Sequence, residues 1–373
     1  SSTDTNVIFS YDADWGNTDS HFPYVYDYFS ETLRDRKSFN QEFRAVSDSA
    51  DFQKNIFFEW VIGTSYLELK ESNLKKDDGL YGDPSDPYGP YASASSSSSK
   101  YKSSNFSVFG NLDYLLSASL KFSIGLRWED WEADYADSLQ ESFNPTDKMS
   151  GGKISLIKNM TNGTNMYASL AKGYKQGGFN LGLGLDANSR NKNLAYDPEF
   201  LTNYELGINT KLLDSRVTFN GVLFYSDRED QQVLISTQTD PSDPNTFSFL
   251  TQNAAEGVNH GLEINMDMDI NQSLSAFVNL GILKTEIKNW QSRQDLEGRA
   301  QAHAPERSYA LGLNWTPTSH TYLAIDFTGK SSFYYSDSHN NKSKAYMLTN
   351  LNLGYVKNNW NYELWARNIF DEY

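Results

Sequence analysis

The sequence contains no cysteine, and only five of its 373 residues are histidine. Disulfides, thiolate metal sites and cysteine nucleophiles are therefore excluded, and a zinc site built from histidines is disfavoured. Basic residues are also scarce, because 32 Lys and Arg stand against 48 Asp and Glu, which gives a net charge of −16. An acidic chain without a basic cluster repels a phosphate backbone, so the composition argues against nucleic-acid binding.

Long apolar runs are missing as well. The mean hydropathy is −0.62, and no stretch approaches the roughly 20 apolar residues that a membrane-spanning helix needs. Aromatic residues, by contrast, are abundant, with 24 Tyr, 22 Phe and 8 Trp beside only 10 Pro. Aromatic side chains are enriched in strands, so the composition favours an all-β chain.

Polar and apolar residues alternate with a period of two along many segments. In the clearest of them, residues 262–270, Leu, Ile and Met occupy one face and Glu, Asn and Asp the other. Such alternation predicts a strand with one apolar and one wet face. The pattern predicts fifteen strands, over residues 3–11, 38–46, 55–70, 103–114, 119–129, 148–159, 165–175, 201–212, 217–227, 259–269, 274–284, 306–315, 320–330, 346–356 and 360–370.

The connections between these strands alternate strictly between short and long. The short ones are residues 47–54, 115–118, 160–164, 213–216, 270–273, 316–319 and 357–359. The long ones are residues 12–37, 71–102, 130–147, 176–200, 228–258, 285–305 and 331–345. A soluble β-sandwich has no reason to sort its connections by length, whereas outer-membrane barrels have short periplasmic turns and longer extracellular loops.

The polar faces also argue against a packed core. Glu205, Glu263 and Asp267 would each cost several kcal/mol if they were buried without a partner. The expected fold is therefore an antiparallel transmembrane β-barrel with a wide, wet lumen, which contacts lipid in the outer membrane of a Gram-negative bacterium.

Several motifs carry a resemblance to a known family. Residues 167–180 read YASLAKGYKQGGFN, and Pro198-Glu199 and the NYELG of residues 203–207 follow. Downstream come the segment from Asn253 to Glu263, the APER of residues 304–307 and the WARNIFDEY of residues 365–373. Together and in this order, these motifs resemble the barrel of TonB-dependent outer-membrane receptors, over most of residues 100–373.

The resemblance implies a barrel of about 22 strands around a plugged lumen, of which the fifteen strands would be the seventh to the twenty-first. Residues 1–373 are therefore expected to be a fragment that forms one partial barrel domain, without the N-terminal plug domain and without the last strand. Hydrocarbon does not tolerate an unpaired sheet edge. We accordingly expect that this chain alone does not make a stable barrel.

The resemblance also implies a function, which is energy-coupled uptake of a scarce solute, with a ferric siderophore as the first candidate. The long loops would capture the solute, and an inner-membrane TonB complex would then displace the plug to admit it to the periplasm. Such a protein is a monomeric barrel at full length, performs no covalent chemistry and needs no cofactor. Siderophore, haem, cobalamin and oligosaccharide all remain open as substrates.

Two other functions remain open at this stage. A passive porin would have no plug and no energy coupling, although diffusion channels usually have fewer strands. A surface adhesin would use its loops for attachment without uptake. Continuous conductance would identify the porin, and loop-dependent binding without uptake the adhesin.

Aromatic and arginine side chains in the long loops are the candidate ligand-binding residues. Aromatic rings stack on planar or sugar-like ligands, and arginine binds the carboxylates of ferric chelates through two hydrogen bonds. The candidates are Trp15, Tyr24, Tyr81, Tyr88, Tyr91, Arg190, Arg228, Arg293 and Arg299. No catalytic constellation stands out, because the paired carboxylates are typical of solvated loops.

The loop of residues 130–147 has six carboxylates and no Lys or Arg. Carboxylates are calcium ligands, but their spacing here matches no EF-hand. A charged surface loop is the favoured interpretation, so we predict no metal site.

Overall fold

The computed structural model describes residues 1–12, 25–82, 87, 91–138, 142–160, 163–180, 195–238, 247–290, 293–337 and 339–372. The chain divides into two compact units. Unit 1 comprises Ser1–Ala45, Val61–Gly110 and Arg127–Met149, and unit 2 comprises Val46–Trp60, Asn111–Leu126 and Ser150–Tyr373.

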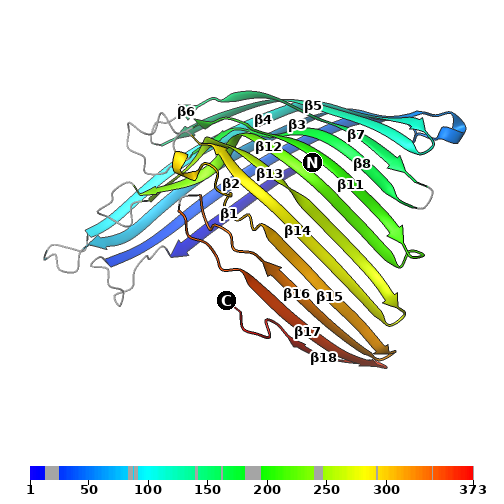
Figure 1. Cartoon of the computed structure of the whole chain (residues 1–373). Helices are drawn as coiled ribbons and strands as arrows, with labels where there is room; N and C mark the ends of the chain where they lie inside the picture. Colours follow the sequence, from blue (N-terminus) through cyan, green and yellow to red (C-terminus); the bar gives the residue numbers. More distant parts are fainter. Residues whose placement is uncertain are drawn as a thin grey trace. The chain divides into compact units, whose positions relative to one another are not determined.

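Fifteen long strands pair in sequence order in the part of the chain that the structure describes (Figure 1). They are β1 (Ser2–Asp12), β2 (Val25–Val46), β3 (Phe58–Gly82), β4 (Tyr91–Ser117), β5 (Leu120–Asp137), β7 (Thr146–Asn159), β8 (Asn165–Lys175), β11 (Glu199–Leu212), β12 (Val217–Gln238), β13 (Phe247–Asn271), β14 (Leu274–Asn289), β15 (Arg307–Thr318), β16 (Thr321–Lys330), β17 (Tyr346–Lys357) and β18 (Trp360–Ala366). The ladders β1–β2 and β7–β8, and those that link β8 through β11 to β18, are antiparallel. The expected all-β, antiparallel fold class is confirmed, and each of the fifteen expected strands overlaps one of these long strands.

The remaining elements are short. They are the two-residue strands β6 (Ser142–Phe143), β9 (Gly178–Phe179) and β10 (Ala195–Tyr196), and the 3-10 helices η1 (Phe52–Lys54) and η2 (Gln294–Leu296). No helix in the described ranges is long and apolar enough to cross a membrane.

Several strands are longer than the sequence predicted and replace much of the expected long loops. β3 continues to Gly82 and β4 begins at Tyr91, and β12 stays paired with β13 as far as Gln238 and Phe247. β2, β5 and β14 likewise extend into the expected long connections, β2 at its beginning and β5 and β14 at their ends. The alternation that marks a strand needs one apolar face, whereas backbone hydrogen bonds between strands continue where both faces are polar.

The last strand is instead shorter than expected and ends at Ala366. Beyond it, Asn368 and Asp371 have φ of 48° and 55°, which extended backbone cannot have. The Asn368 side chain donates to the Glu372 carbonyl at 3.0 Å and accepts from the Glu372 amide at 3.1 Å. The regular ladder with β17 ends at Ala366, and beyond it the Ile369 amide donates to the Thr349 carbonyl of β17 at 3.0 Å.

The apolar face of unit 2 is exposed rather than buried. Leu206, Leu223, Leu262 and Ile282 lie opposite one another in one row across β11, β12, β13 and β14. Three of these side chains are more than half exposed, with 59% for Leu206, 53% for Leu223 and 53% for Ile282. An apolar surface of this extent needs a non-aqueous neighbour, as a membrane-spanning strand has.

The opposite face of the same strands is polar and internally hydrogen-bonded. Glu205 accepts hydrogen bonds from the Tyr167 hydroxyl at 3.2 Å and from the Asn203 amide at 2.8 Å. Ser226 donates in turn to Asn203 at 2.7 Å. The carboxylate that argued against a packed core therefore has partners on a wet face.

The buried apolar cluster of unit 2 lies at the long-connection ends of the strands. Val233 of β12, Ile287 of β14, and Trp290 and Leu296 of the β14–β15 connection pack together, with exposed fractions between 0% and 6%. This cluster anchors the β14–β15 connection, which supplies Arg299 and Gln301 of the candidate site.

Candidate functional site

The candidate site is a set of polar residues of unit 2 at the long-connection ends of the strands, which we call the rim cluster: Glu199, Arg228, Gln231, Arg299, Gln301 and Asp337. The cluster lies where the pairing of strands β12, β13 and β14 is irregular. The ladder β12–β13 shifts register between Arg228 and Gln232, and the ladder β13–β14 shifts between Glu256 and Gly257. Such bulges turn side chains away from their regular direction and are frequent beside functional sites.

Arg228 of β12 contacts both the neighbouring strand β11 and the β14–β15 connection. Its Nε donates to Glu199 Oε1 at 2.9 Å, a second guanidinium nitrogen donates to the same oxygen, and Nη1 lies 3.5 Å from Gln301 Oε1. Glu199 Oε2 also accepts from the Gln232 amide at 3.0 Å. The Arg228 side chain is 25% exposed, so part of the guanidinium can reach a ligand, whereas Glu199 is 9% exposed.

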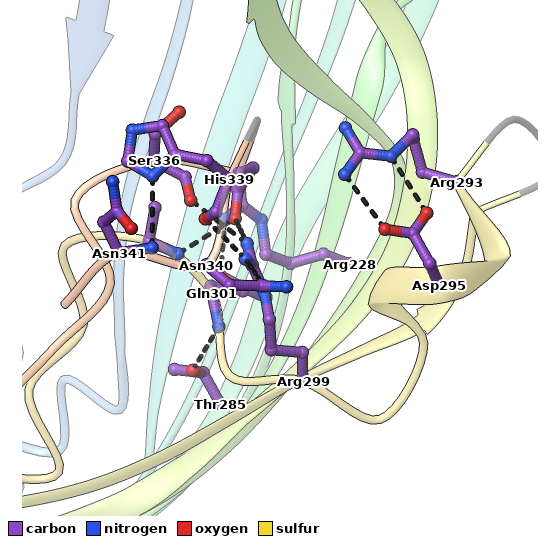
Figure 2. Close-up of polar contacts among 12 residues, drawn as sticks. Arg228, Thr285, Arg293, Asp295, Arg299, Gln301, Ser336, His339, Asn340 and Asn341 are labelled. Atoms are coloured by element: carbon purple, nitrogen blue, oxygen red, sulfur yellow. Dashed lines mark hydrogen bonds and ion pairs between the residues drawn. The ribbon is translucent and has the colours of Figure 1, made fainter.

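Arg299 joins the β14–β15 connection to the β16–β17 connection. Its guanidinium donates to Asp337 Oδ1, the His339 carbonyl and Asn340 Oδ1, each at 2.9 Å, and to the Ser336 carbonyl at 3.2 Å (Figure 2). It also stacks on Tyr334, with 4.3 Å from Cζ to the ring centroid. With 8% of its side chain exposed, Arg299 holds the two connections together.

Gln301 and Gln231 each have a buried polar atom with no partner among the described residues. The atoms are Gln301 Nε2, a donor, and Gln231 Oε1, an acceptor. The two residues are 7% and 8% exposed. Both atoms lie beside Gly257, within 3 Å of the position that a Cβ atom would take. Buried polar atoms normally have partners, so this donor and acceptor are available to a water or to a ligand group.

Replacing Gly257 by alanine is expected to disturb this arrangement. The added Cβ would lie 2.6 Å from Gln301 Nε2 and 2.9 Å from Gln231 Oε1. Because both side chains are buried, we expect a loss of about 1–3 kcal/mol in the free energy of unfolding, measured by urea denaturation in detergent micelles. The control is Gly173→Ala in β8, where nothing lies within 4 Å of the added atom. Equal losses in the two variants would contradict the prediction.

Arg293 forms a separate ion pair within its own connection. Nε and Nη2 donate to the two oxygens of Asp295 at 2.9 and 3.0 Å (Figure 2). These hydrogen bonds hold the pKa of the Asp295 carboxyl below its ordinary value. The stabilisation is therefore complete above the unfolded pKa of about 4 and is lost as the pH falls through the lower, folded pKa. Since Asp295 is 59% exposed, the contribution is small.

The other candidate residues are placed as follows. Trp15, Tyr24, Tyr88 and Arg190 lie outside the described residues, and of Tyr81 only the backbone is described, in β3. Tyr91 is the first residue of β4, in unit 1, and 52% of it is exposed. Tyr81, Tyr91 and Arg228 belong to strands and not to loops, which corrects the expectation. The cause is the strand extension described above.

Sequence reasoning missed several members of the rim cluster and its surroundings. The sequence indicated Glu199 only as part of a family motif. It gave no indication of Gln231, Gln301 and Asp337, because a lone amide or carboxylate in a polar segment forms no recognisable pattern.

In the expected loop of residues 130–147, β5 continues to Asp137 and β7 begins at Thr146. The described residues contain no group of three or more His, Asp or Glu that could hold a metal ion.

The fold and the site define a class of protein, a many-stranded antiparallel sheet in which unit 2 has one exposed apolar face and one polar face. A family model described as TonB dependent receptor-like, beta-barrel, matches residues 2–369. The chain belongs to this family. The family consists of transport receptors and not of enzymes, in agreement with the sequence analysis.

Solved structures with the same fold include three receptors. The ferric yersiniabactin uptake receptor FyuA from Yersinia pestis is 18% identical, with a TM-score of 0.68 over 99% of this chain and 56% of its own. The siderophore receptor PiuA from Acinetobacter baumannii is 16% identical, with a TM-score of 0.67 over 94% and 54%. The ferric preacinetobactin receptor BauA, also from Acinetobacter baumannii, is 15% identical, with a TM-score of 0.69 over 99% and 55%. The chain thus spans about half the length of these receptors.

Proposed function

We propose that this chain is the barrel of an energy-coupled transport receptor in the outer membrane of a Gram-negative bacterium. In this proposal, residues 1–373 form a single domain that works with a plug domain and a last strand outside this chain. The full-length protein is a monomeric barrel in contact with outer-membrane lipid, and an inner-membrane TonB complex acts through the plug. The observation that carries the proposal is the exposed row of Leu206, Leu223 and Ile282 opposite a hydrogen-bonded polar face.

The first candidate for the transported solute is a ferric siderophore. Support comes from the chemistry of the rim cluster, where the partly exposed guanidinium of Arg228 suits an anionic chelate. The orphaned amide nitrogen of Gln301 adds a neutral donor nearby. FyuA is a receptor for ferric yersiniabactin and BauA a receptor for ferric preacinetobactin. Another solved structure with a similar fold is that of a copper transporter, OprC. The nine candidate residues from the sequence remain proposed ligand-binding residues, among which Arg299 acts by positioning the connections.

The test is uptake of radioactive iron by cells that carry the full-length protein as their only receptor. Energy-coupled transport predicts saturable uptake of ferric siderophores that stops when the TonB complex is deleted. Uptake that continues at the same rate after the deletion would identify a passive channel. Surface binding without any uptake would identify an adhesin, so both results contradict the proposal.

A further inference from the structure

Unit 1 has a groove whose lining is rich in lysine. Its volume is about 570 Å³, and Lys37 of β2, Lys70 of β3, and Lys100 and Lys102 of β4 line it. We call it the lysine groove. Such a concentration of ammonium groups is unexpected in a chain whose net charge is −16.

The lysines lie on the same face of the strands as the exposed apolar side chains. Lys37 is two residues from Phe39, Lys70 is four from Tyr66, and Lys102 is four from Phe106, and even spacing along a strand keeps residues on one face. These aromatic residues are exposed by 44%, 37% and 43%.

Two of these aromatic residues lie side by side across β2 and β3. The rings of Phe39 and Tyr66 are 6.4 Å apart, centroid to centroid. Along β3 and β4, the change from aromatic residue to lysine runs toward the β3–β4 connection, on the long-connection side. The groove therefore adjoins an apolar band with exposed aromatic residues, a residue type that in membrane proteins lies at the depth of the lipid headgroups.

Among the described residues, two carboxylates lie within ion-pair distance of the four lysines. Lys70 and Lys102 share one carboxylate, that of Glu68, at 2.6 and 3.7 Å. Lys37 lies 3.3 Å from Asp4. Lys100 has no ion-pair partner among the described residues. Three further acidic residues, Asp35, Glu71 and Asp134, belong to the lining, as do the polar residues Ser72 and Asn144. The Glu71 carboxylate accepts a hydrogen bond from Arg36 at 2.7 Å.

We propose that the lysine groove binds the phosphate of an anionic outer-leaflet lipid, whose acyl chains lie on the apolar band beside it. Ammonium groups and neutral donors together suit phosphate oxygens, and lysines at this depth attract anionic headgroups. A lipid fits better than a soluble anion because the groove is continuous with the apolar band. The inference rests on the proposed function only in taking this band to face lipid.

The test is lipid binding by the full-length protein in detergent micelles, measured by native mass spectrometry. The probes are phosphatidic acid and, with the same acyl chains, diacylglycerol, which lacks the phosphate. The test variant is Lys70→Gln, Lys100→Gln and Lys102→Gln combined. The control variant, with the same change of charge, is Lys153→Gln, Lys211→Gln and Lys330→Gln, at positions that alternate with the apolar residues and so lie on the polar face.

We expect phosphatidic acid to bind well above diacylglycerol, and the groove variant to bind it roughly tenfold more weakly or worse, while the control variant binds like the wild type. Far-UV circular dichroism checks that both variants are folded. Equal binding by the groove variant, or an equal loss in the control, would overturn the proposal. Full displacement of the lipid by inorganic phosphate would show a site for soluble anions and would overturn it too. Iron uptake is a separate readout, so loss of transport with intact lipid binding contradicts only the proposed function.

Discussion

Replacing Arg299 by alanine is expected to separate the β14–β15 and β16–β17 connections and to lower the free energy of unfolding by about 3 kcal/mol. The side chain is 8% exposed, and its partner Asp337 is 17% exposed. Without the guanidinium, the hydrogen bond that the Asp337 carboxylate keeps among the described residues is the one from the Ala302 amide, at 3.0 Å. The hydrogen bonds from Arg299 to the carbonyls of Ser336 and His339 are lost as well, and each hydrogen bond from a charged donor contributes to stability.

Hydrogen exchange followed by mass spectrometry would locate the effect of this substitution. We expect faster exchange in residues 293–303 and 331–342, and no change in the ladder β8–β11. Arg299→Lys is the informative second variant, because lysine keeps the charge but cannot reproduce the planar fork of guanidinium hydrogen bonds. An alanine variant with wild-type exchange in both segments would show that the other contacts, and not Arg299, hold the connections together.

The sequence predicted the strands best where one face meets an apolar environment. Residues 165–175 were expected as a strand and form β8 with the same bounds, because alternation and the turn before it agree. Prediction stopped early at β12, which continues through Val233 and Ile235. There the apolar side chains pack against the β14–β15 connection, a contact that no period within one strand can reveal.

The candidate site was harder to predict because its contacts join distant parts of the chain. Arginines in long connections were chosen by residue type, and Arg228 and Arg299 do lie in the rim cluster. Their partners depend on which strands and connections meet, since Arg299 and Asp337 are 38 residues apart and Arg228 and Gln301 are 73 apart. The sequence shows which arginines could bind a chelate. The structure shows that Arg228, Arg293 and Arg299 are each paired with a carboxylate of this chain.

Leu223→Arg is expected to reduce the stability of the full-length barrel in lipid by about 2–4 kcal/mol, the cost of arginine near the middle of a bilayer. Leu223 is 53% exposed and lies between Leu206 and Leu262 in the apolar row. The guanidinium would enter hydrocarbon with no carboxylate beside it. The measurement is urea unfolding of the protein in phospholipid vesicles, followed by tryptophan fluorescence.

The neighbouring residue provides the matched control, because Val222 lies on the opposite face, across from Glu263 and Gly207. An arginine at this position would face water and a carboxylate, so we expect Val222→Arg to change the stability by less than about 1 kcal/mol. The two variants differ only in which face receives the charge. If the strands have one face in lipid and one in water, Leu223→Arg lowers the stability strongly and Val222→Arg lowers it little. Equal losses would contradict that division and, with it, the observation on which the proposed transport function depends.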